Sequence, residues 1–219
     1  MKKIISFSLW GTNPMYNIGA IKNSELAKDI YPDWICRYYV GKSVPTEIIE
    51  KLNSFDNTEI ILMDTDGDWT GMFWRFYPSS EDDVDIVIVR DCDSRLNERE
   101  KNAVDEWIKS DKGFHIMRDH PYHGTEILGG MWGSKKGTIF DMRLKIDNYV
   151  KGDFWQVDQY FLRDIIYPLI KNNCMVHDEF FDFNFNSKPF PSKREINRFV
   201  GQAFNENDDM LYPEHNIHF

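Results

Sequence analysis

Two aspartates stand directly after a continuous apolar run near the middle of the chain. Residues Val84 to Val89 have the composition of a buried strand, and Asp91 and Asp93 follow it two positions apart. On extended backbone, residues i and i+2 point the same way, so both carboxylates can face one cation at the end of the strand. Mg2+ or Mn2+ bound there would bridge the protein to a diphosphate. The flanking arginines, Arg90 and Arg95, favour this interpretation over a solvated acidic turn, and Arg90 is expected to help bind the diphosphate.

A second acidic pair, Asp64 and Asp66, follows another apolar strand, Thr58 to Met63. A strand that runs into D-x-D-G is similar to the start of haloacid-dehalogenase-type phosphatases, in which one aspartate is the nucleophile and the next the acid/base. That family carries the motif on its first strand and has Thr or Val where Asp68 stands here. A polar loop with a turn at Gly67 is the simpler interpretation, and the phosphatase is kept as an alternative.

The composition limits the possible partners of these carboxylates. The formal net charge is -10 and no basic block occurs, which argues against a nucleic-acid partner. An anionic substrate must then be held by a metal or by a few arginines. The three cysteines are widely spaced, so neither a disulfide framework nor a structural zinc site is indicated. No run of about 18 apolar residues is present, so no transmembrane segment is expected.

Alternating strands and helices must position the carboxylates. Runs of β-branched and aromatic residues predict five strands, at Lys3 to Leu9, Trp34 to Val40, Thr58 to Met63, Val84 to Val89 and Phe114 to Met117. Cap residues and apolar periodicity predict helices at residues 23–30, 46–54, 97–110 and 154–171. Asn97 and Glu100 have capping-box spacing, and Asp153 is the expected N-cap of the last helix. The alternation predicts an α/β fold with a mainly parallel sheet, whose ligands bind outside the carboxyl ends of the strands.

The chain as a whole resembles small bacterial and viral glycosyltransferases with a GT-A fold. The matching segments follow one another in order: SFSLWG, GAIKNSELAKDIYPDW, CRYYV, MFWRFYP, RDCDSR, MRDHPYH and ILGGMWG. The most specific are RDCDSR and GGMWG. The resemblance implies a nucleotide-diphospho-sugar transferase fold in which Asp91 and Asp93 are the D-x-D metal motif.

The resemblance also assigns residues to the nucleotide-sugar donor. The end of the first strand would line the nucleotide pocket through Ser8, Leu9, Trp10 and Gly11. Arg75 would lie near the base or the diphosphate. Gly129, Gly130, Met131 and Trp132 match a segment that borders the donor sugar and the acceptor. Paired glycines permit close backbone approach to a ligand, and an exposed Trp132 would stack on a sugar ring; a tight turn packed under Trp132 is the alternative.

Later residues are expected to complete the site. Arg118 would neutralise phosphate and His120 would hydrogen-bond a sugar hydroxyl, with a capped loop and a surface salt bridge as the alternative. Asp158 would deprotonate the acceptor hydroxyl in an inverting reaction. GT-A enzymes recruit a late histidine as a further metal ligand, which favours His177 over Asp178.

The sequence therefore predicts a metal-dependent glycosyltransferase of polysaccharide biosynthesis with Mn2+ or Mg2+ as cofactor. It would move a sugar from a UDP- or GDP-sugar to a glycan or other hydroxyl-bearing acceptor. Residues 1–95 would form the nucleotide-binding half of one domain, and residues 96–219 the acceptor-binding half and a C-terminal tail. A cytoplasmic location, in a bacterial cell or a virus-infected host cell, is expected. A haloacid-dehalogenase-like phosphatase and a non-catalytic carbohydrate-binding protein remain the alternatives.

Overall fold

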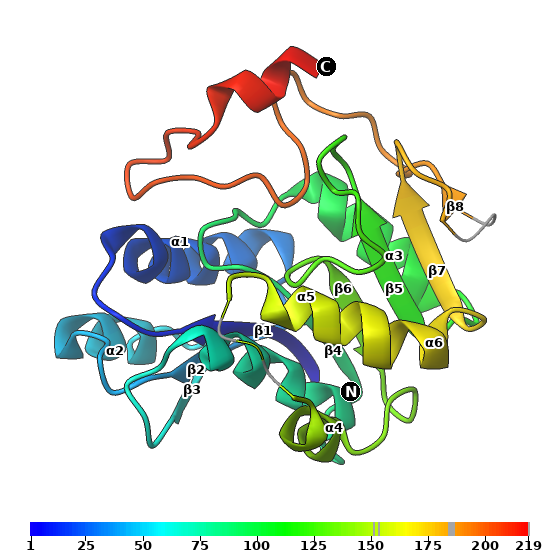
Figure 1. Ribbon diagram of the computed structural model, residues 1–219. Helices are drawn as coiled ribbons and strands as arrows, with labels where there is room; N and C mark the ends of the chain where they lie inside the picture. Colours follow the sequence, from blue (N-terminus) through cyan, green and yellow to red (C-terminus); the bar gives the residue numbers. More distant parts are fainter. Residues whose placement is uncertain (151, 153, 184–186, 219) are drawn as a thin grey trace.

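The predicted strands all belong to one sheet in the computed structural model, which describes residues 1–150, 152, 154–183 and 187–218 (Figure 1). Within these residues the sheet has eight strands in the order β3-β2-β1-β4-β6-β5-β7-β8. The strands are β1 Lys3–Leu9, β2 Ile35–Val40, β3 Thr58–Leu62, β4 Ile86–Val89, β5 Phe114–Arg118, β6 Trp132–Lys135, β7 Cys174–Asp178 and β8 Ser187–Lys188. All five predicted strands are present, with ends that differ by one or two residues.

The sheet is mainly parallel, as predicted. Only β6 runs against its neighbours, and it pairs antiparallel with both β4 and β5. The sequence prediction missed β6, because Gly133, Ser134 and Lys135 lack the β-branched side chains that mark a strand. Insertion of β6 between β4 and β5 separates two strands that follow each other in the chain.

Helices cover both faces of the sheet (Figure 1). One face is covered by α1 Pro14–Ile30, α2 Thr46–Asn53 and α3 Glu98–Lys109. The other face is covered by the 3-10 helix η1 Trp69–Ser80, by α4 Met142–Asn148, and by the consecutive segments α5 Val157–Phe161, η2 Leu162–Ile166 and α6 Tyr167–Ile170. A short 3-10 helix, η3 Pro213–His218, follows in the C-terminal tail.

The helix predictions hold with two differences. Asn97 caps α3 as expected, because its side chain accepts a hydrogen bond from the backbone N–H of Glu100 at 3.0 Å. The first helix, predicted from residue 23, starts at Pro14 because Asn13 caps it and accepts from the N–H of Met15. The long helix contains a π-helical turn before Pro168, whose nitrogen has no hydrogen to donate. Its predicted cap, Asp153, lies outside the described residues.

Strand alternation divides the core into two layers. On β1, Ile4 belongs to the cluster beneath η1, whereas Ile5 and Phe7 belong to the cluster beneath α1 and α3. On β4, Val89 faces the η1 side and Ile88 faces the α3 side. The alternation continues to the next two residues, so Arg90 lies on the α3 side and Asp91 lies on the η1 side.

The carboxyl ends of β1 and β4 meet at the point where the strand order reverses. The chain proceeds from β1 to β2 and β3 in one direction, and β4 then lies on the opposite side of β1. In open α/β sheets the crevice at such a switch point is where ligands bind. Ser8 to Gly11 end β1 at this edge, and Asp91 and Asp93 follow β4 there.

Residues after β8 cross the same edge of the sheet. The backbone N–H of Phe204 donates to the carbonyl oxygen of Asp93 at 2.8 Å, and Ser94 forms an antiparallel bridge with Ala203. The tail is thus joined to the acidic loop by backbone hydrogen bonds. In the part of the chain that is described, no helix has the length and apolar character needed to cross a membrane.

Candidate functional site

A cavity of about 530 Å³ opens at the switch point of the sheet, and we call it the switch-point cavity. Its volume is in the range of small-molecule and cofactor sites. Eleven residues predicted from the sequence line it: Ser8, Leu9, Trp10, Gly11, Arg75, Asp91, Asp93, Gly129, Gly130, Met131 and Asp158. These residues come from β1, η1, the loop after β4, the loop before β6, and α5, so the fold brings together segments that are far apart in the sequence.

An arginine joins two carboxylates in the cavity wall. The Arg75 guanidinium donates through Nη1 to Asp91 Oδ1 and through Nη2 to Asp158 Oδ2, the latter at 2.8 Å. Arg75 and Asp158 are both buried. Burial raises the pKa of the Asp158 carboxyl, and the charge of Arg75 opposes that rise. The sequence predicted Arg75 beside the nucleotide; its guanidinium instead holds two protein carboxylates.

Helix η1 fixes Arg75 in this position. The Asp68 side chain caps η1 by accepting from the N–H of Thr70 at 2.8 Å. One turn later, the backbone N–H of Arg75 donates to Ser8 Oγ at 3.0 Å, which ties η1 to the end of β1. The hydroxyl of Ser8 therefore holds the backbone of Arg75 in place.

The second carboxylate of the D-x-D motif has a different environment. The side chain of Asp93 makes no hydrogen bond or ion pair with another described residue. Burial, followed by the charge of Asp91, raises its pKa to about 7. A divalent cation beside Asp91 and Asp93 would neutralise this charge.

The donor set fits a hard divalent cation. Carboxylate oxygens are the ligands that Mg2+ and Mn2+ prefer. Asp91, Asp93 and Asp158 place three carboxyl groups in the cavity wall against one guanidinium, that of Arg75. No group of three His, Cys, Asp or Glu side chains with metal-binding geometry occurs among the described residues. The remaining ligands would then come from substrate oxygens and water.

Two glycines allow the carboxylates to lie this close to the backbone. A Cβ on Gly130 would overlap with Asp91 Oδ2, and a Cβ on Gly129 would lie 2.5 Å from Asp158 Oδ2 and 2.7 Å from Arg75 Nη2. The paired glycines were predicted to permit close approach to a ligand. In the structure they pack against the charged side chains of the cavity wall.

Arg90 does not reach the cavity, contrary to the prediction. It follows the alternation of Ile86 and Ile88 and points towards α3, where its Nε donates to Glu100 Oε1 at 3.1 Å. Arg90 and Glu100 are both fully buried. Arg90 therefore belongs to a buried ion pair on the far side of the sheet, away from any diphosphate at Asp91.

Trp132 is not exposed, so the prediction of a sugar-stacking face was wrong. It is the first residue of β6, and the pairing of β6 with strands on both sides places its ring in the core. The ring stacks on Phe114 with centroids 5.2 Å apart and an interplanar angle of 13°. The alternative interpretation, a turn packed under Trp132, agrees with this burial.

Arg118 and His120 do not line the switch-point cavity either. Arg118 is fully buried, and its Nε donates to Asp178 Oδ2 at 2.5 Å. Its Nη1 donates to the carbonyl oxygen of Glu126 at 2.6 Å. His120 is buried against the C-terminal tail through the carbonyl oxygen of His215. Both residues hold loops at the sheet edge rather than facing a phosphate or a sugar.

The structure does not bring His177 to the D-x-D carboxylates. It lies on β7 and points to the α3 face, where its Nδ1 lies 2.8 Å from His115 Nε2 and its Nε2 lies 3.2 Å from Glu106 Oε2. Burial lowers the pKa of His177. Asp178, the weaker candidate, is engaged by Arg118.

The alternative acidic pair is at the edge of the sheet. Asp64 and Asp66 follow β3, which has a neighbour on one side only, and both side chains are exposed. Neither lines the switch-point cavity. This position does not suit a phosphatase nucleophile, which must lie in a protected pocket beside its acid/base partner.

Sequence reasoning missed several residues that line the cavity. Aromatic side chains on its rim are partly exposed, namely Tyr16 on α1, Trp69 on η1 and Trp155 before α5. Gly201 and Ala203 reach the cavity from the tail. No local motif marks these positions, because each is brought there by tertiary packing.

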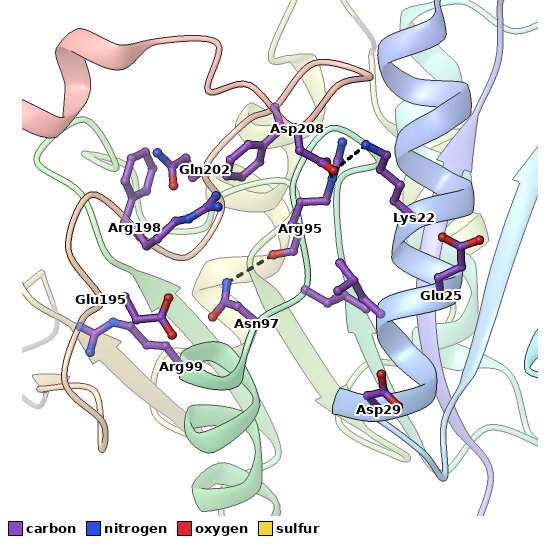
Figure 2. Close-up of a pocket in the computed structure, with 14 residues that line it drawn as sticks. Lys22, Glu25, Asp29, Arg95, Asn97, Arg99, Glu195, Arg198, Gln202 and Asp208 are labelled. Atoms are coloured by element: carbon purple, nitrogen blue, oxygen red, sulfur yellow. Dashed lines mark hydrogen bonds and ion pairs between the residues drawn. The ribbon is translucent and has the colours of Figure 1, made fainter.

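A separate cavity of about 580 Å³ lies between α1, α3 and the tail, and we call it the tail cavity (Figure 2). Lys22 and Arg95 both point to Asp208, with N···O distances of 2.5 and 2.8 Å (Figure 2). Neither Asp91 nor Asp93 lines it. Its charged groups fasten the tail to the rest of the molecule, so it is the weaker candidate for the site of chemistry.

Comparison with known proteins gives similarity in structure only. No protein-family profile matches the chain, and no curated protein matches it in sequence. A glycosyltransferase involved in the glycosylation of the major capsid of PBCV-1 superposes with a TM-score of 0.53 at 14% identity, over 81% of this chain and 82% of that one. Residues 1–349 of TarS from S. aureus give a TM-score of 0.52 at 13% identity, over 87% of this chain.

The chain spans 59% of that TarS chain. A second structure of the same TarS fragment, in complex with UDP, superposes with a TM-score of 0.51 at 13% identity. At such identities the likeness concerns the fold. The chain has the mixed α/β fold of the GT-A glycosyltransferases.

Proposed function

We propose that this protein is a metal-dependent glycosyltransferase that uses a nucleotide-sugar donor. The observation that carries the proposal is the cavity at the switch point, where Asp91, Arg75 and Asp158 form one hydrogen-bonded chain beside Asp93. The fold supports it, since one neighbour is named as a glycosyltransferase and another, TarS, was solved with UDP.

Asp91 and Asp93 would hold Mg2+ or Mn2+ together with the donor diphosphate. When bound, the cation would offset the negative charge that develops on the nucleoside diphosphate as it leaves. Arg75 would keep Asp91 oriented. Its guanidinium is held by Asp158, and its backbone N–H donates to Ser8 Oγ. The donor sugar would lie against Gly129 and Gly130, which line the same cavity.

Asp158 is the group proposed to accept the proton. In the transfer, the bond between the anomeric carbon and the diphosphate oxygen breaks, and its electron pair leaves with the nucleoside diphosphate. The acceptor oxygen forms the new bond to the anomeric carbon, and its proton passes to Asp158. The raised pKa of Asp158 makes it a better base than an exposed aspartate.

With this assignment, the two halves of the chain would bind different substrates. Residues 1–95 would supply most of the nucleotide-binding side, through the end of β1, η1 and the D-x-D loop. Residues 96–219 would supply the acceptor side, through α5 and the loop before β6.

Release of nucleoside diphosphate from a panel of nucleotide sugars tests the proposal. The panel contains UDP-glucose, UDP-galactose, UDP-N-acetylglucosamine and GDP-mannose, each with Mn2+ or with EDTA. The native protein is expected to hydrolyse one donor slowly in Mn2+ only, and Asp93→Ala to lose this activity. Asp64→Ala is the matched control and should keep it. Loss of activity in Asp64→Ala with activity retained in Asp93→Ala would overturn the proposal.

A further inference from the structure

A cavity of about 550 Å³ adjoins the switch-point cavity, and we call it the outer cavity. Two segments line it, residues 121–128 after β5 and residues 155–163 at the start of α5. Four residues line both cavities: Leu128, Trp155, Gln156 and Gln159. The two cavities therefore form one continuous cleft. Asp158 and the shared residue Gln159 lie in the first turn of α5, and Trp155 and Gln156 come directly before that helix.

The outer cavity presents aromatic rings to solvent. Trp155 is 67% exposed, Tyr122 is 63% exposed and Tyr160 is 41% exposed. Large apolar side chains gathered in a concave, water-facing surface mark a ligand-binding surface. The Tyr160 ring is held in place, since Phe154 packs edge-on against it with centroids 5.3 Å apart and the Arg163 guanidinium lies 4.3 Å from its centroid.

Polar groups stand beside these rings. The side-chain amides of Gln156 and Gln159 form no hydrogen bond with any other described residue. Each amide offers donors and an acceptor to a ligand. Gln156 also has a left-handed backbone conformation with φ of 75°, which non-glycine residues adopt rarely and mostly where the surrounding structure requires it.

The outer cavity carries little charge. Arg163 is the one ionised side chain among the described residues that line it, and its Nε pairs with Asp164 Oδ1 at 2.7 Å. A phosphate or a nucleotide would find no unpaired cation there. A neutral ligand with an apolar face and a rim of hydroxyl groups matches rings and amides side by side, and a pyranose ring has this chemistry.

We propose that the outer cavity binds a saccharide acceptor. Trp155 and Tyr160 would stack on its rings, and Gln156 and Gln159 would bind its hydroxyl groups. The bound saccharide would direct one hydroxyl along the cleft towards Asp158. The assignment rests on the proposed function and names the acceptor class for that site.

Binding is tested first, without any donor. Saturation-transfer NMR uses maltose, lactose, cellobiose and chitobiose as probes with the native protein, Tyr160→Ala and Phe140→Ala. Phe140 is 67% exposed and lines none of the three cavities, so it is a matched aromatic control. At least one disaccharide should give a signal that Tyr160→Ala weakens and Phe140→Ala retains. Absence of signal for all probes, or equal signal in both variants, would overturn the assignment.

Kinetics then separates this proposal from the proposed function. With the donor that the protein hydrolyses, the same disaccharides are offered as acceptors, and a short synthetic peptide with Ser and Thr is offered as a rival. Loss of one stacking ring should raise the acceptor KM about tenfold in Tyr160→Ala, with a smaller change in the donor KM. If donor hydrolysis depends on metal and the sugar is transferred to the peptide but to no saccharide, the saccharide assignment is wrong and the transferase activity is correct. Failure of every donor would sink the transferase itself.

Discussion

At the scale of single residues, Asp93 carries an electrostatic cost that a ligand would relieve. Its carboxyl is buried beside Asp91, and no cationic side chain of the described residues is within hydrogen-bond reach of it. The nearest guanidinium groups, those of Arg75 and Arg95, are committed to other oxygens. Sites arranged for a cation are expected to be strained in this way when the cation is removed.

Asp93→Asn should therefore stabilise the metal-free protein. The pKa of Asp93 is raised from 3.8 to about 7, so the folded state binds this proton more tightly than the unfolded chain. Its contribution to stability is full below pH 3.8 and is lost as pH rises through about 7. The gain from Asp93→Asn should reach of order 1–3 kcal/mol at pH 8 and be small at pH 4.5. Urea unfolding in EDTA measures it.

Asp64→Asn is the control for this experiment, since Asp64 is exposed. Its effect on the free energy of unfolding should be below about 0.5 kcal/mol at both pH values. A gain for Asp93→Asn that is the same at both pH values would show that the carboxyl is not strained by its surroundings.

Gly130 is the residue whose replacement should damage the cation site most selectively. A Cβ at this position overlaps with Asp91 Oδ2, so Gly130→Ala must displace that carboxylate. We expect metal-dependent donor hydrolysis to fall about 100-fold or more, because small displacements of a positioning group have large effects on rate. Circular dichroism and donor hydrolysis are measured on the same sample. A folded Gly130→Ala protein with native activity would exclude Asp91 as a metal ligand.

At the scale of elements, alternation along β4 decides which charged side chains take part. Arg90 and Asp91 are adjacent in the sequence, yet one lies under α3 and the other faces η1. The D-x-D spacing predicted both aspartates at one site, and both line the switch-point cavity. Arg90 was wrongly included because sequence proximity was taken as spatial proximity. Arg75, 16 residues before Asp91 in the chain, is the arginine that contacts Asp91 and Asp158.

Substitution by Met should lower the stability of the protein at Arg90 and its catalytic rate at Arg75. Arg90→Met leaves Glu100 buried without its partner and should lower the free energy of unfolding by about 3 kcal/mol, with the donor KM unchanged. Arg75→Met removes the bridge between Asp91 and Asp158 and should lower kcat about 100-fold. Urea unfolding and steady-state kinetics are compared for both. A donor KM raised in Arg90→Met would restore the original prediction for Arg90.

At the scale of the whole molecule, the C-terminal tail closes the edge of the site. Asp208 pairs with Lys22 on α1 and with Arg95 after the D-x-D motif (Figure 2). The backbone N–H of Phe204 donates to the carbonyl oxygen of Asp93. A second anchor is the buried Asp119, which accepts from Arg194 at 2.6 Å. The tail segment between these anchors contributes Gly201 and Ala203 to the switch-point cavity.

Asp208→Ala should loosen this closure with little loss of stability. Both ion pairs of Asp208 are partly exposed, so their removal should cost about 1 kcal/mol or less. The donor KM should rise about three- to tenfold, because the loop that carries Asp93 loses its support from the tail. Asp56→Ala, which removes an exposed ion pair with Lys28, is the control and should not change the KM. An unchanged KM in Asp208→Ala would show that the tail plays no part in donor binding.

The sequence predicted local features well and long-range ones poorly. The five predicted strands and the cap of α3 depend on neighbouring residues, and they are confirmed, whereas β6, β7 and β8 were not predicted. The burial of Trp132 depends on β6, a strand without a β-branched signal, and the position of His177 depends on which face of β7 it occupies. The rim residues Trp69 and Trp155 meet only in the folded chain. Such contacts follow from tertiary packing, and tertiary packing leaves no local pattern that can be recognised in a single sequence.

The most direct measurement for the central claim is the binding of UDP and GDP by calorimetry, with Mn2+ and with EDTA, to the native protein and to Asp93→Asn. We predict that one of the two nucleotides binds the native protein in Mn2+, at least about tenfold more tightly than in EDTA, and that Asp93→Asn loses this difference. Equal binding with and without Mn2+, or Mn2+-dependent binding that survives in Asp93→Asn, would contradict a diphosphate site built on Asp91 and Asp93.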